Sequence, residues 1–215
     1  PGIFELNLDL RTLEVTCAPN KQIGPCVDPA GDFAAWKGGF TYDGEIDNDG
    51  AFVVTEEYFV DGQPVDINAL PAPSYCDGGS VTLTYKVTDF CGSQECTSTF
   101  TVVAPDNLAL STKPANVTTL ACEDPTAKFA TWVAALNGMT ASGGCNALVE
   151  YSVTPDVSLL TAGFCDAGQV ISIDINAKDD CGETTPVTAT FTVPAYIDNL
   201  ALSTKPANVT TLACE

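Results

Sequence analysis

The chain has 215 residues and carries 28 acidic against eight basic residues, which gives a net charge of −20 at pH 7. This charge excludes binding to nucleic acid and to anionic membrane surfaces, because both need clustered Lys and Arg. Histidine is absent, so the chain has no Ser-His-Asp or Cys-His arrangement, and we do not expect an enzyme. No apolar run approaches the roughly 20 residues of a membrane span, so no membrane insertion is expected in this segment.

The sequence repeats itself with a period near 92 residues. The segment DNLALSTKPANVTTLACE occupies 106–123 and occurs again, letter for letter, at 198–215. An identity of this length does not arise by chance and indicates a repeat array. We expect repeats that run end to end with short junctions. The expected boundaries are 1–104 for the first repeat, with 1–7 as the tail of a preceding segment, 105–195 for the second, and 196–215 for the opening strand of a third.

The alternation of apolar and polar residues predicts strands along most of each repeat. In the first repeat it marks two long strands at 81–87 and 96–102, and in the second it marks 171–177 and 187–193. A period of two over this length is typical of half-buried antiparallel strands. Short strands separated by turns at this spacing predict an Ig-like β-sandwich in each repeat.

One segment of each repeat has helical spacing instead. In the second repeat Asp124 and Pro125 predict the start of a helix, and Asn137 followed by Gly138 predicts its end. The same Cys-x-Asp-Pro-x3-Phe-x2-Trp pattern starts at residue 26 of the first repeat. The predicted fold class is therefore all-β, with tandem Ig-like β-sandwich domains that each contain a short helical crossover and are stapled by disulfides.

The disulfide staples would come from ten cysteines. The chain has no Cys-x-x-Cys pair of the kind that binds zinc, and no histidine. Structural disulfides are therefore expected, and with them an oxidising, extracellular setting. The cysteines lie at positions 17, 26, 76, 91, 96, 122, 145, 165, 181 and 214.

The first disulfide is predicted from two cysteines of the first repeat that are both missing from the second. The second repeat has Lys113 and Val187 where the first repeat has Cys17 and Cys96. Two cysteines that are present together and absent together behave as bonded partners would. First and last strands are also neighbours in an Ig-like sandwich, so Cys17–Cys96 is predicted.

Strand geometry addresses the second repeat. Cys165 and Cys181 flank a strand of about nine residues, which separates them by about 30 Å, and the Cα atoms of a disulfide lie about 6 Å apart. The order of the strands then favours one disulfide at each end of the domain, Cys122–Cys165 and Cys145–Cys181. In the first repeat, Cys26 and Cys76 match Cys122 and Cys165, so they are predicted to bond to each other. The full predicted set is Cys17–Cys96, Cys26–Cys76, Cys122–Cys165 and Cys145–Cys181, with Cys91 and Cys214 unpaired.

A family resemblance follows from these motifs. TCAPNKQIGPC, the Trp segment, YKVTDFCG and CTSTFTV resemble the hyalin-repeat (HYR) family of Ig-like domains. More narrowly, they resemble the cysteine-rich HYR-like repeats of giant Bacteroidota surface adhesins, including gliding-motility adhesins. The resemblance covers both repeats and the third opening. It implies an extracellular, cell-surface stalk that extends a binding tip. Its partners would be neighbouring repeats of the same chain and a surface or glycan ligand elsewhere in the full protein.

Two other functions fit the same composition. A carbohydrate-binding module of a secreted enzyme would be favoured by Trp36 or Trp132 lying exposed in a groove, whereas helical spacing beside Phe33 and Phe129 predicts that both lie in the core. The other alternative is a purely structural sheath or surface-layer protein whose copies bind each other. Extensive contacts between neighbouring chains would favour that function.

One acidic segment matches a calcium loop. EIDNDGAFVVTE, residues 45–56, follows the EF-hand order, with Glu45, Asp47, Asp49 and Glu56 as side-chain ligands and the carbonyl of Ala51 as a fifth. The loop begins with Glu rather than Asp and has no evident flanking helices. DNDG followed by AFVV is also an ordinary hairpin turn, which we favour. Ca²⁺ is thus the one cofactor that the sequence suggests, as an ionic cross-link in the first repeat.

Overall fold

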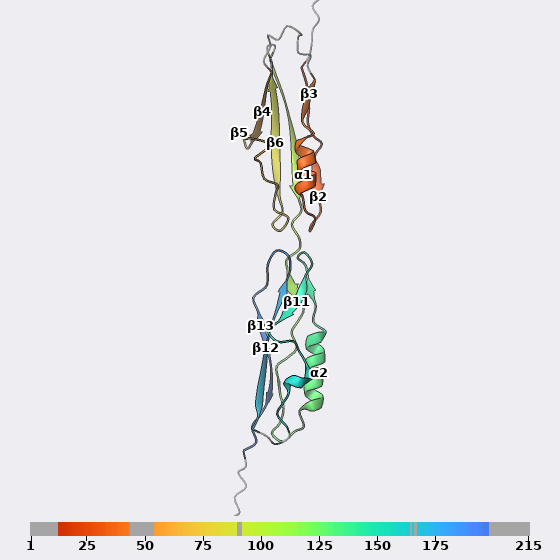
Figure 1. The fold of residues 1–215 in the computed structure, drawn as a ribbon, viewed down its shortest axis with the longest axis vertical. Helices are drawn as coiled ribbons and strands as arrows, with labels where there is room; N and C mark the ends of the chain where they lie inside the picture. Colours follow the sequence, from red (N-terminus) through yellow and green to blue (C-terminus); the bar gives the residue numbers. More distant parts are fainter. Residues whose placement is uncertain (1–12, 44–53, 90–91, 164, 166, 198–215) are drawn as a thin grey trace, which may run out of the picture. The chain divides into compact units, whose positions relative to one another are not determined.

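The computed structural model describes residues 13–43, 54–89, 92–163, 165 and 167–197 (Figure 1). The chain forms two compact units that do not coincide with the sequence repeats, because two loops of the second repeat belong to the first unit. The repeat boundaries given above stay a prediction. The first unit comprises Pro1–Ala109, Ala141–Leu148 and Ala177–Thr184, and the second comprises Leu110–Thr140, Val149–Asn176 and Thr185–Glu215.

The first repeat is a sandwich of one large and one small sheet. The large sheet has the order β2-β7-β6-β4-β5, and β1 pairs with β3 in the small one. The β2–β7 pair is parallel, while the β6–β7 hairpin is antiparallel. The opening segment therefore contributes a strand to each sheet. The elements are β1 (Glu14–Thr16), β2 (Lys21–Ile23), α1 (Ala30–Lys37), β3 (Thr41–Asp43), β4 (Thr55–Val60), β5 (Gln63–Pro64), β6 (Gly79–Thr88) and β7 (Ser93–Val102).

The second repeat has the same strand order, except that no described strand takes the place of β5. Its large sheet has the order β11-β12-β13-β9, with β9 parallel to β13, and β8 pairs with β10. The described chain is thus all-β with two short α-helices, in tandem Ig-like sandwiches, as predicted. The elements are β8 (Ala109–Leu110), β9 (Val117–Thr118), α2 (Thr126–Asn137), β10 (Ala141–Ser142), β11 (Leu148–Tyr151), the 3₁₀ turn η1 (Val157–Leu159), β12 (Gln169–Lys178) and β13 (Val187–Val193).

Each helix lies beside the long strands of its own unit (Figure 1). Helix α2 begins at Thr126, one residue later than predicted, because Pro125 takes the N-cap position. The Asp124 carboxylate accepts a hydrogen bond from the Thr126 backbone N–H at 3.0 Å, which satisfies one of the free donors at the helix start. The helix ends at Asn137 before Gly138, as predicted.

The two cores differ in the hydrogen-bond partner of their buried tryptophan. Trp36 is buried, and its indole N–H donates to Ser98 Oγ at 3.0 Å. In the second repeat Ala189, in the matching strand, takes the place of Ser98. Trp132 is equally buried, and its indole Nε1 has no hydrogen-bond partner among the described residues. An unpaired buried donor loses its hydration without compensation, so the second core should be the less stable at this point.

Candidate functional site

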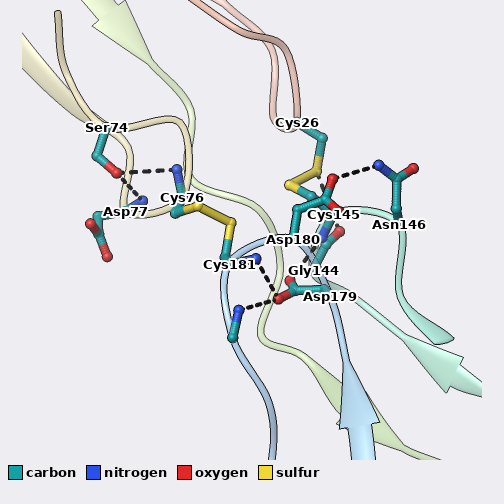
Figure 2. The surroundings of a disulfide bond; sticks show 11 residues. Cys26, Ser74, Cys76, Asp77, Gly144, Cys145, Asn146, Asp179, Asp180 and Cys181 are labelled. Atoms are coloured by element: carbon teal, nitrogen blue, oxygen red, sulfur yellow. Dashed lines mark hydrogen bonds between the residues drawn. A yellow bond between two sulfur atoms is a disulfide. The ribbon is translucent and has the colours of Figure 1, made fainter. Parts of the chain in front are cut away.

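Four cysteines from the two repeats meet in one place in the first unit (Figure 2). Cys26 bonds to Cys145, with Cα atoms 5.2 Å apart and 119 residues between them in sequence. Cys76 bonds to Cys181, with Cα atoms 5.5 Å apart and a separation of 105 residues. Both bonds therefore join the first repeat to a loop of the second.

These bonds correct two predicted pairs. Cys26–Cys76 and Cys145–Cys181 do not form in the structure, where each of the four has a partner in the other repeat. The prediction treated every repeat as closed on itself. The loops with Cys145 and Cys181 instead belong to the first unit, where the nearest cysteines are those of the first repeat.

The other two predicted bonds are present. Cys17 bonds to Cys96 with Cα atoms 5.9 Å apart, and Cys122 bonds to Cys165 with Cα atoms 4.3 Å apart. All eight cysteines within the described ranges are thus in disulfides. The two cysteines left unpaired in the prediction, Cys91 and Cys214, lie outside the described residues.

Asp179 holds the two loops of the second repeat together. Its Oδ2 accepts from the backbone N–H of Cys145 at 2.9 Å, and its Oδ1 accepts from Cys181 at 2.8 Å and from Gly182 at 2.7 Å. These backbone donors favour the ionised carboxylate, with Cys145 contributing most, so the pKa of Asp179 lies below its ordinary value. A single carboxylate therefore fixes both loop cysteines.

Further contacts complete the loop pair. The Asn146 side-chain amide donates to Asp180 Oδ2 at 2.6 Å, and the Asp180 backbone N–H donates to the Cys145 carbonyl at 3.0 Å. Gly144 has a φ of 58°, and a Cβ there would collide with the Asp179 carboxylate. Glycine suits this position because the backbone is left-handed there and the carboxylate, held by three backbone donors, lies close to it. The loops at 141–148 and 177–184 are thus hydrogen-bonded to each other, and each carries one of the cysteines that bond to the first repeat.

The first-repeat side of the junction is also ordered locally. Ser74 Oγ accepts hydrogen bonds from the backbone N–H groups of Cys76 and Asp77, at 3.2 and 3.1 Å, and Figure 2 shows this turn facing Cys181. Cys26 has a φ of 61°, a left-handed conformation between strand β2 and helix α1. Such a conformation is uncommon for a non-glycine residue, and here it belongs to the bend between the two elements.

Sequence reasoning missed Asp179, Asp180 and Asn146. One signal was available, because both repeats contain Asp-x-Cys-Gly at the turn between their long strands, at 89–92 and 179–182. In the first repeat Asp89 Oδ1 accepts from the Gly92 backbone N–H at 2.9 Å, as its counterpart does in the second. The shared motif was therefore a signal that Asp179 orders its turn, although it does not say which cysteine bonds to Cys181.

The calcium loop stays a prediction. Glu45, Asp47, Asp49 and Ala51 lie outside the described residues. Glu56 lies in β4, where its Oε2 accepts from the hydroxyls of Tyr85 at 2.8 Å and Tyr58 at 3.3 Å. Burial, followed by these contacts with Glu56, raises the pKa of Tyr85 above its ordinary value. In the part of the chain that the structure describes, no three acidic, cysteine or histidine side chains are grouped to hold a metal ion.

The tryptophans do not form a sugar-stacking platform. Trp36 is 4% exposed and Trp132 is 3% exposed, and each packs against the phenylalanine of its own large sheet, Phe100 and Phe191 respectively. Side chains buried to this extent are not available to stack on a sugar ring. None of the described helices is long and apolar enough to cross a membrane.

Comparisons with known proteins do not assign a family. No family model matches the chain, and no curated protein matches it. Among solved structures it is similar to Drosophila N-cadherin EC1-4, with a TM-score of 0.34, 10% identity, and 87% of this chain and 50% of that chain covered. It is also similar to the titin domains Z1Z2 in complex with telethonin, with a TM-score of 0.30, 12% identity, and 85% and 95% covered. The chain spans about half of that N-cadherin chain. These likenesses are too distant to support a function, so the Ig-like assignment rests on the strand order.

Proposed function

We propose that the chain is a repeat-stalk segment of a secreted cell-surface adhesin or filament, of the HYR-like kind found in gliding-motility adhesins, and that it extends a binding tip from the cell. The observation that carries this proposal is the pair of disulfides Cys26–Cys145 and Cys76–Cys181. They bond consecutive repeats to each other through side chains. A stalk bears load along its length, and a covalent bond at the junction keeps a repeat attached where non-covalent contacts would open.

Other observations support the same proposal. Four disulfides fit an extracellular, oxidising setting. A net charge of −20 favours solubility and opposes collapse of the repeats onto one another. The resemblance to HYR-like adhesin repeats implies a spacer, with the ligand-binding function elsewhere in the protein, because the fold alone does not name a ligand. The burial of Trp36 and Trp132 argues against a carbohydrate-binding module.

The location can be tested on cells that produce the protein. Antibodies against the 215-residue chain should label intact cells, and external protease should remove the label. A signal that appears only after permeabilisation would contradict a surface location.

The spacer role needs a second experiment. An in-frame deletion of these repeats should leave export intact and reduce attachment or gliding. Replacing them with an equal length of unrelated Ig-like repeats should restore the activity, because a spacer acts through its length. If the replacement fails while the protein is still exported, these repeats carry a specific binding function instead.

A further inference from the structure

Cys122 stands in the second repeat where Cys26 stands in the first. The two have left-handed φ angles of 58° and 61°. Each follows an edge strand that pairs in parallel with the last strand of its repeat. Each is followed, two residues later, by an aspartate whose carboxylate accepts from the first helical N–H at 3.0 Å, Asp124 in one repeat and Asp28 in the other. The two cysteines therefore occupy equivalent positions.

Cys165 likewise corresponds to Cys76. Each comes shortly before a glycine with a positive φ, Gly168 at 82° and Gly78 at 68°. A Cβ on either glycine would collide with the backbone just after the last strand of the same repeat. Both turns thus lie against the same end of the sandwich, and both lead directly into the first long hairpin strand.

These equivalent pairs have different partners. In the first repeat, Cys26 and Cys76 bond to the loops of another repeat. In the second repeat, Cys122 and Cys165 bond to each other. The same two positions of a repeat are therefore found in two bonding states. In one state both cysteines bond to another repeat, and in the other they bond to each other.

We propose that the face bearing Cys122 and Cys165 is the docking surface for a further repeat, and that their disulfide is the undocked state. The occupant is a repeat that presents two loop cysteines like Cys145 and Cys181, held by an aspartate like Asp179. On docking, Cys122 bonds to the first loop cysteine and Cys165 to the second. This inference goes beyond the stalk proposal and does not depend on the protein being an adhesin.

The bond change is a thiol–disulfide exchange followed by one oxidation. A thiolate of the incoming loop attacks the Cys122 sulfur, which breaks the Cys122–Cys165 bond and releases Cys165 as a thiolate. The second link then forms from the Cys165 thiol and the remaining loop thiol. That step releases two electrons and two protons, which oxidised glutathione takes up as it becomes two molecules of glutathione. Both the Cys122–Cys165 bond and the two bonds to another repeat can therefore form in a buffer of reduced and oxidised glutathione.

The 215-residue chain allows the reverse test. Changing Cys145→Ser and Cys181→Ser removes the partners of Cys26 and Cys76. If the two faces are equivalent, peptide mapping without reduction should recover Cys26 joined to Cys76, the bond that the unaltered chain lacks. The Cys17–Cys96 fragment reports that the repeat has folded. Free thiols at Cys26 and Cys76 in the folded variant would overturn the proposal.

The forward test completes a third repeat. Because 198–215 repeats 106–123 letter for letter, adding a second copy of 124–197 after Glu215 yields a third repeat identical to the second. After folding in reduced and oxidised glutathione, peptides with the Cys122 sequence should be joined to peptides with the Cys145 sequence. Serine at the two added loop cysteines should abolish that product. Absence of the cross-repeat product from the unaltered extended chain would overturn the proposal, whatever the cell-surface experiments show.

Discussion

Pulling the oxidised chain by its ends should extend it far less than its length allows, because disulfides shorten the path that force follows. From Cys17 the force crosses to Cys96, follows the backbone back to Cys76 and crosses to Cys181. This path contains about 20 backbone residues (96 minus 76), whereas the reduced chain has about 164 (181 minus 17). At about 3.5 Å per extended residue, the two paths span roughly 70 and 570 Å.

The measurement also separates the two possible pairings. With the within-repeat bonds expected from the sequence, the shortest path would use Cys17–Cys96 and Cys122–Cys165. It would contain about 42 residues (122 minus 96, and 181 minus 165), or roughly 150 Å at about 3.5 Å per residue. The observed pairing therefore makes the oxidised chain about 80 Å shorter under load.

Optical tweezers with handles at the two termini can measure both values. Reduction with a phosphine should release about 500 Å of contour length, as the difference between the two paths at about 3.5 Å per residue. The double variant Cys76→Ser and Cys181→Ser should lengthen the oxidised path by about 80 Å, while Cys122→Ser with Cys165→Ser should leave it unchanged. An oxidised length that does not respond to the first variant would refute the cross-repeat pairing.

Three further predictions concern individual side chains. Ser98→Ala should lower the free energy of unfolding by about 1–3 kcal/mol, because it leaves the buried indole N–H of Trp36 unpaired. Ala189→Ser should raise the free energy of unfolding by about 1 kcal/mol, because it gives Trp132 a hydrogen-bond partner. Denaturant unfolding that shifts in the same direction for both variants would contradict this reason. Asp179 has a depressed pKa, so its contribution to stability is present above about pH 4, the unfolded pKa, and is lost as the pH falls through the lower folded pKa. Asp179→Asn should therefore lower the melting temperature at pH 7 and flatten its fall at acidic pH. Parallel curves for the two proteins would show that the pKa of Asp179 is the same in the folded and the unfolded chain, and would refute the depressed pKa. If residues 45–56 bind Ca²⁺, the chain should melt at a higher temperature in millimolar calcium than in chelator, with Asp49→Ala removing the difference; equal melting temperatures would leave a plain hairpin turn.

Local sequence patterns were sufficient to predict much of the fold. The period of two predicted the β6–β7 and β12–β13 hairpins, because alternate side chains of a strand point to opposite faces of a sheet. Asp-Pro at one end and Asn-Gly at the other predicted helix α2 within one residue, because they satisfy or end the helical hydrogen bonds locally. The Cys17–Cys96 disulfide could be predicted because both cysteines are missing from the second repeat, so the two repeats serve as natural variants of each other.

The tertiary structure decided the pairing of four cysteines, Cys26, Cys76, Cys145 and Cys181. Every repeat has cysteines at both ends, and nothing in the sequence says whether an end closes on itself or bonds to the next repeat. That choice depends on where the loops at 141–148 and 177–184 pack, and they pack in the first unit. Asp179 then fixes both loop cysteines through backbone donors from separate segments. The contact of Asp179 with Cys145 has no sequence pattern, because it is made to a backbone N–H in a distant segment, and backbone N–H groups are the same in every residue except proline.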